Sequence, residues 1–158
     1  MNAVHFRTDH NFGRVTPHRS IPSLEYVPNG EKRQIILVVD DEPFVLNSVC
    51  AVLAYAGYDV LRASSGPEAL HIASRYPGRI HLLLTDVRMP GPSGPAMAQQ
   101  FSALHPEAHC VFMAGLPDHP DLPERVRRER TALLAKPFTP KILLEAVGQV
   151  LETAVHSA

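Results

Sequence analysis

The run Ile35-Ile36-Leu37-Val38-Val39, followed at once by Asp40 and Asp41, indicates the fold class of this chain. Five consecutive apolar residues, four of them β-branched, are typical of a strand that is buried on both faces, as in a parallel sheet covered by helices. An acidic pair directly after such a strand lies at its carboxyl end, where open α/β sheets bind their ligands. The segment therefore predicts a parallel sheet with a charged site at one edge.

The alternation of strand and helix continues along the rest of the chain. Pro43 suits the first turn of a helix, and Gly57 suits the position just past its end. Five strands are expected at 35–39, 58–61, 80–85, 109–113 and 132–135, with further helices at 65–75, 95–104, 120–130 and 140–151. Five strands alternating with five helices predict an α/β fold: a five-stranded parallel sheet in a doubly wound (βα)5 sandwich, with right-handed crossovers and helices on both faces.

The composition indicates one folded domain. A chain of 158 residues with 45% apolar residues suits a single core. We expect that domain at 34–153, after a flexible N-terminal tail at 1–33 that holds three prolines and no hydrophobic period, and before a short tail at 154–158. Because so few residues follow the last helix, we expect no output domain.

Charge and hydropathy exclude several classes of protein. With 15 basic and 16 acidic residues the chain has no basic surplus, so we expect no nucleic-acid binding. No apolar stretch approaches the roughly 20 residues of a membrane span, and the N-terminus has no signal-peptide core. Cys50 and Cys110 lie in apolar segments, which favours reduced core thiols over a disulfide. We expect a cytoplasmic protein without a membrane partner.

Three aspartates and one lysine follow three of the predicted strands. Asp40 and Asp41 follow the first, Asp86 follows the third and Lys136 follows the fifth, so a parallel sheet would gather all four at one edge. Carboxylates about 4 Å apart repel by roughly 4 kcal/mol at an effective dielectric near 20, so such a group takes up protons or recruits a cation. Oxygen ligands favour Mg²⁺, and with Lys136 they form a site for a phosphoryl group.

Each of these residues also has an ordinary structural interpretation. Asp40 and Asp41 precede a helix and would complement its N-terminus as cap and first-turn residues. Asp86 precedes a loop rich in Pro and Gly and would serve as a turn former, and Lys136 would be an exposed lysine. The coincidence of all three features at one sheet edge favours the functional interpretation.

Three segments, taken in order, match a known family. They are ILVVDDEP at 36–43, LLTDVRMPGPSG at 83–94 and LAKPF at 134–138, and over residues 34–153 the chain resembles the receiver domain of bacterial response regulators. The resemblance implies a stand-alone receiver in two-component phosphorelay signalling. It would take a phosphoryl group on Asp86 from a histidine kinase or a histidine phosphotransfer protein, act on an unknown downstream protein, and not be a turnover enzyme.

The resemblance also implies a role for each residue of the site. Asp86 would be the nucleophile, and Lys136 would pair with it at rest and with the phosphoryl oxygens afterwards. Mg²⁺ would be held by Asp41 directly, by Asp40 directly or through water, by Asp86, and by the backbone carbonyl of Arg88.

Two positions depart from the family pattern. The family normally has Ser or Thr where this chain has Ala114, and the segment 111–116 contains no hydroxyl. Its switch aromatic on the fifth strand is Leu133 here. We therefore expect phosphorylation to survive and its structural consequence to be atypical. The peptide bond before Pro137 is expected to be cis, as is usual in this family.

Two other functions compete with the receiver. A pseudo-receiver would keep the fold and bind a partner without phosphorylation, which the alanine at 114 favours. An enzyme with an aspartyl nucleophile, such as a small phosphatase, would normally have a second carboxylate two residues after the nucleophile, where this chain has Arg88.

Overall fold

The structure is a computed structural model that describes residues 33–115 and 130–155, with side chains up to Glu152. The predicted N-terminal tail up to residue 32, the helix expected at 120–130 apart from its last residue, and the last three residues of the chain lie outside this range.

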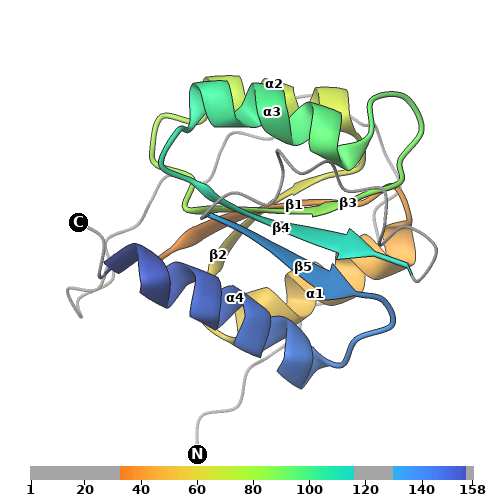
Figure 1. Cartoon of the computed structure of the whole chain (residues 1–158), viewed down its shortest axis with the longest axis vertical. Coiled ribbons are helices and arrows are strands. Elements are labelled where there is room, and N and C mark those ends of the chain that lie inside the picture. Colours follow the sequence, from red (N-terminus) through yellow and green to blue (C-terminus); the bar gives the residue numbers. More distant parts are fainter. Residues whose placement is uncertain (1–32, 116–129, 156–158) are drawn as a thin grey trace, which may run out of the picture. The chain divides into compact units, whose positions relative to one another are not determined.

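One parallel sheet forms the centre of the domain (Figure 1). Its five strands run in the order β2-β1-β3-β4-β5 and every neighbouring pair is parallel. The strands are β1 (Ile35–Val39), β2 (Asp59–Ala63), β3 (Leu82–Asp86), β4 (His109–Ala114) and β5 (Thr131–Ala135). This order, in which the chain crosses from β2 back over β1 to β3, is that of a doubly wound sheet and confirms the predicted fold class.

Helices cover both faces of this sheet. Figure 1 shows α2 and α3 on one side and α1 and α4 on the other. Their bounds are α1 (Pro43–Tyr55), α2 (Gly66–Arg75), α3 (Gly94–Leu104) and α4 (Pro140–Val155). As predicted, α1 begins at Pro43 and ends just before Gly57, whose φ of +97° suits a residue without a side chain. Among the described helices, none has the length and apolar character that crossing a membrane requires.

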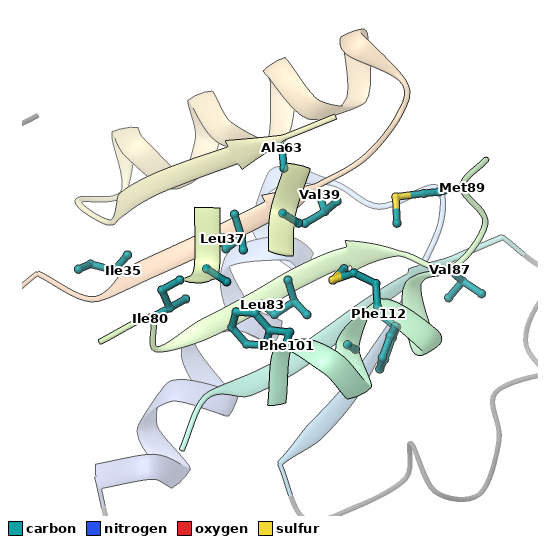
Figure 2. Packing of buried hydrophobic residues seen from close by; sticks show 14 of the residues in the cluster. Ile35, Leu37, Val39, Ala63, Ile80, Leu83, Val87, Met89, Phe101 and Phe112 are labelled. Atoms are coloured by element: carbon teal, nitrogen blue, oxygen red, sulfur yellow. The ribbon is translucent and has the colours of Figure 1, made fainter. Parts of the chain in front are cut away.

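Two apolar clusters fill the space between the sheet and its helices. Successive side chains of a strand point to opposite faces, so Ile35, Leu37 and Val39 pack toward α2 and α3 while Ile36 and Val38 pack toward α1 and α4. Figure 2 shows the first cluster, in which Phe101 and Phe112 are packed near Leu83. All residues of β1 and β3 are buried, and both strands are accordingly apolar except for Thr85 and Asp86 at the end of β3. Cys50 and Cys110 are free thiols packed against these clusters.

Some predicted boundaries were wrong by one to four residues. Strand β2 begins at Asp59 and continues to Ala63, because each of its residues pairs with one residue of β1. Strand β3 begins at Leu82 instead of Ile80, because the N–H of Ile35 donates to the imidazole Nδ1 of His81 (3.0 Å) and not to a backbone carbonyl. Helix α4 runs beyond residue 151 to Val155.

Candidate functional site

The carboxyl ends of β1, β3, β4 and β5 lie along one edge of the sheet. Asp40 directly follows β1, Asp86 is the last residue of β3 and Lys136 directly follows β5. The N–H of Lys136 donates to the carbonyl oxygen of Ala114 at the end of β4 (2.7 Å), which ties the last two strand ends together. The predicted gathering of these residues therefore follows from the parallel strands.

The side chain of Lys136 joins two buried carboxylates. Its Nζ lies 2.8 Å from Oδ1 of Asp86 and 3.0 Å from Oδ2 of Asp40. Asp40 is 1% exposed and Asp86 is 9% exposed. Charged groups this deeply buried are stable only when paired, and Lys136 supplies the pairing for both. The interpretation of Lys136 as a solvent-facing lysine is therefore wrong.

The pKa values of Asp86 and Lys136 are both raised, for different reasons. Burial raises the pKa of Asp86; the hydrogen bond and positive charge of Lys136 oppose this rise, and the charge of Asp40 adds to it. Burial on its own lowers the pKa of Lys136, but its hydrogen bonds and ion pairs with Asp86 and Asp40 outweigh burial, so its pKa is raised. The ammonium thus stays charged while the negative charge around it is incompletely balanced.

Backbone amides hold the two carboxylates in place. Oδ1 of Asp40 accepts the N–H of Glu42 (2.9 Å), which leaves Oδ2 for Lys136. The backbone N–H of Arg88 donates to the carboxylate of Asp86, and this bond lowers the pKa of Asp86. Asp40 is thus a buried, lysine-paired residue, which a simple helix cap would not need to be.

Asp41 is the one predicted carboxylate that does not join this group. It is partly exposed, and within the described residues its side chain has no hydrogen bond or ion pair. No set of three or more His, Cys, Asp or Glu side chains in residues 33–115 and 130–152 is arranged to hold a metal ion. The sequence prediction that three carboxylates meet is borne out for two of them.

The residues nevertheless fit a hard cation in chemistry and in charge. Asp40 and Asp86 face a single ammonium, so one negative charge is left over, and the carboxylate of Asp41 follows directly in the chain. Carboxylate and carbonyl oxygens are the ligands that Mg²⁺ prefers. Burial and, after it, the charge of Asp40 raise the pKa of Asp86, and a divalent ion would oppose both by favouring the ionised carboxylate.

Ala114 and Leu133 lie on β4 and β5, the two strands whose ends the N–H of Lys136 joins. Ala114 is 1% exposed and ends β4, and Leu133 on β5 is partly buried against the cluster that contains Phe112, its neighbour on β4. The Lys136–Pro137 peptide bond is cis, as expected.

Sequence reasoning missed two contacts of Asp86. One is the backbone N–H of Arg88, for which only a carbonyl role was expected. The other is the hydroxyl of Thr85, which donates to the carbonyl oxygen of Asp86 (3.0 Å). A single polar residue within the buried run Leu82-Leu83-Leu84-Thr85 was the signal available for the second contact.

A family model described as the response regulator receiver domain matches residues 36–148. The chain is similar to the sensor kinase CckA of Brucella abortus, with 31% identity over 74% of this chain and 12% of that protein. It is also similar to the regulatory protein VanRB of Enterococcus faecalis, with 31% identity over 73% of this chain and 51% of that protein. This chain thus spans about half or less of the length of these curated relatives.

Solved structures of receiver domains are also similar to this chain, and the similarity covers nearly the whole length of each solved structure. The receiver domain of the hybrid histidine kinase CckA is 34% identical, with a TM-score of 0.64 over 74% of this chain and 98% of that one. A response regulator receiver domain protein from Clostridium thermocellum is 27% identical, with a TM-score of 0.71 over 79% and 99%. Vibrio cholerae CheY4 is 27% identical, with a TM-score of 0.67 over 76% and 100%.

Proposed function

Because this chain belongs to the response regulator receiver domain family, we propose that it accepts a phosphoryl group on Asp86 in two-component signalling. The donor is a phosphohistidine of a histidine kinase or of a histidine phosphotransfer protein, and the phosphorylated chain then acts on a downstream protein in the cytoplasm. The observation that carries this proposal is the position of Lys136, whose ammonium contacts both Asp86 and Asp40.

The chemistry is a transfer between two nucleophiles. A carboxylate oxygen of Asp86 forms a bond to phosphorus as the P–N bond of the donor histidine breaks, and the departing imidazole keeps the electron pair of that bond. The attacking carboxylate must be ionised, which its contacts with Lys136 and with the N–H of Arg88 favour. Little covalent chemistry is left to the protein, so positioning and charge dominate.

Lys136 changes partner in this scheme. At rest it shares its charge between Asp86 and Asp40. When Asp86 is esterified, that carboxylate loses its charge, and the new phosphoryl oxygens replace it as acceptors for the ammonium. The other oxygen of Asp40 accepts the N–H of Glu42, a bond that does not involve Lys136.

Mg²⁺ is the cofactor we propose for this site. Asp40, Asp41, Asp86 and the backbone carbonyl of Arg88 would hold it, and it would neutralise charge on the transferring phosphoryl oxygens. The two carboxylates of Asp40 and Asp86, which share the single ammonium of Lys136, support this assignment.

The structural response to phosphorylation is proposed to be atypical. Ala114 offers no hydroxyl to a phosphoryl group at the end of β4, and Leu133 is aliphatic. A neutral hydrogen bond contributes about 0.5–1.5 kcal/mol, so its absence leaves phosphorylation possible while removing one contact between a phosphoryl group and the end of β4. NMR spectra with and without beryllofluoride test this. Large ordered shifts after Ala114 and along β5 would contradict it.

Phosphorylation itself is tested by intact mass after incubation with Mg²⁺ and acetyl phosphate. Wild type should gain one phosphoryl group, D86N should gain none, and D59N, which alters an aspartate at the far end of the sheet, should behave like wild type. Omission of Mg²⁺ should abolish the gain. No gain in wild type would instead support a pseudo-receiver that binds its partner without phosphate, and multiple turnover would support an aspartyl phosphatase.

A further inference from the structure

Thr85 is a polar side chain buried within an apolar strand. It is fully buried, and its three predecessors in β3 are leucines. A hydroxyl in such a place is unfavourable unless it forms a hydrogen bond, and this one donates to the carbonyl oxygen of the next residue, Asp86 (3.0 Å). The bond fixes the peptide group on the carboxyl side of the proposed phosphoacceptor.

Gly94, the first residue of helix α3, lies directly against the same peptide group. A Cβ at this position would collide with the carbonyl oxygen of Asp86 and would lie 3.0 Å from its carbonyl carbon. The N–H of Gly94 donates to the carbonyl of Val87 (3.0 Å). The first residue of α3 therefore packs directly on the chain that leaves Asp86, which only glycine permits.

Backbone hydrogen bonds fix the two ends of the loop that runs from β3 to α3. The N–H of Val87 donates to the carbonyl of Met113 in β4 (3.0 Å), and the carbonyl of Val87 accepts the N–H of Gly94. Arg88, the next residue, donates its own N–H to the carboxylate of Asp86. Rotation of the peptide between Asp86 and Val87 would carry the Arg88 N–H away from that carboxylate.

We propose that Thr85 and Gly94 form a clamp on the peptide after Asp86 that aims the Arg88 N–H at the reacting carboxylate. Both act through Asp86 and are positioning residues. The inference rests on the proposed function, because the carboxylate that they orient is the proposed phosphoacceptor.

Two substitutions of Thr85 in the full-length chain separate this role from simple packing. Thr85→Val keeps the buried shape and removes the hydroxyl, and Thr85→Ser keeps the hydroxyl and removes a methyl group. Two quantities are measured: the rate of phosphorylation by acetyl phosphate with Mg²⁺, per folded protein, and the amide proton shift of Arg88 in the unphosphorylated protein.

The clamp predicts that T85V is phosphorylated roughly 3- to 10-fold more slowly, as expected for one lost orienting hydrogen bond, and that its Arg88 amide proton moves upfield. T85S should retain the wild-type shift and a rate within about twofold of wild type. If T85V does not fold, Thr85→Ala takes its place against T85S.

A folded T85V with the wild-type Arg88 amide shift would overturn the clamp, whatever its rate of phosphorylation. A wild-type protein that gains no phosphoryl group would overturn the proposed function instead. In that case the amide shift still tests the clamp, so the two failures are distinguishable.

Discussion

The ammonium of Lys136 lies 2.8 Å from Oδ1 of Asp86, although the strands that carry these residues are not neighbours. Lys136 follows β5, Asp86 ends β3, and β4 lies between them. The side chain therefore reaches over the end of β4, where Ala114 is small and buried, and continues to Asp40 at the end of β1. One cation thus serves two buried carboxylates from two other strands.

Replacing Lys136 by Met should destabilise the protein near neutral pH. The variant leaves Asp86 and Asp40 without their cation, and because Lys136 is partly exposed we expect a loss of about 1–3 kcal/mol, less than the roughly 3–5 kcal/mol of a fully buried pair. The pKa of Asp86 rises further, so its ionisation then opposes folding above its unfolded value of 3.8. Denaturant unfolding from pH 7 to pH 3 should show that the free energy of unfolding of the variant is below that of wild type, and that this difference shrinks as the pH falls.

Lys141→Met is the matched control for that variant. The side chain of Lys141 is 83% exposed and its partner Glu145 lies one helical turn away at 3.8 Å. Its removal should change stability by less than about 0.5 kcal/mol at any pH. Equal losses in the two variants would contradict the assignment of Lys136 as the cation of the site.

Stability should fall as the pH drops below about 6.5 because His81 must be neutral in the fold. Its Nδ1 accepts the N–H of Ile35, and burial, together with the charge of Arg79, lowers its pKa below 6.5. The unfolded chain then binds more protons between the two pKa values, so stability is complete above 6.5 and is lost as the pH falls through the folded value. Urea unfolding from pH 8 to pH 4 measures this.

His81→Asn should reduce this loss, because an amide oxygen accepts the same bond and does not titrate in this range. The exposed His71 in α2 provides the control, and H71N should keep the wild-type dependence. His109 is also buried with a lowered pKa, caused by burial and then by Arg130 and Arg79, so some dependence remains in H81N. An unchanged pH profile in H81N would disprove the role of His81.

Two glycine-to-alanine substitutions should act in opposite directions. In Gly94→Ala the new methyl group meets the carbonyl of Asp86, so we expect a loss of about 1–3 kcal/mol from overpacking and a lower rate of phosphorylation. In Gly148→Ala, within α4, nothing lies within 4 Å of the new atom, and the helix should gain about 0.5–1 kcal/mol. Thermal unfolding compares the two, and a neutral G94A would show that α3 does not press on Asp86.

Introducing a hydroxyl at the end of β4 should make stability depend more strongly on a phosphoryl mimic. Ala114 is 1% exposed, so Ala114→Ser should lose about 1–2 kcal/mol without ligand. Beryllofluoride offers that hydroxyl an acceptor and should restore part of the loss. Ala69→Ser, at a buried position in α2, should show no such recovery. Equal recovery in the two variants, followed by melting temperature, would contradict the proposed consequence of Ala114.

Local patterns in the sequence are enough to predict the strands, the alternation with helices, and the placement of Asp40, Asp86 and Lys136 at strand ends. These follow from local patterns, since a buried parallel strand is an unbroken apolar run and a polar residue after it must lie at the edge. The boundaries of β2 and β3 were less predictable, because pairing with β1 and the imidazole of His81 decide them.

Which of the gathered side chains touch depends on the packing of the folded chain. Asp40 and Asp41 are equivalent in the sequence pattern, yet Asp40 is buried against Lys136 and Asp41 is partly exposed, because consecutive residues at a strand end point in different directions. The contacts of Asp86 with Thr85, Gly94 and the N–H of Arg88 likewise depend on where α3 packs against β3. No local sequence pattern specifies how closely α3 approaches β3, because the packing of side chains between the helix and the sheet sets that spacing.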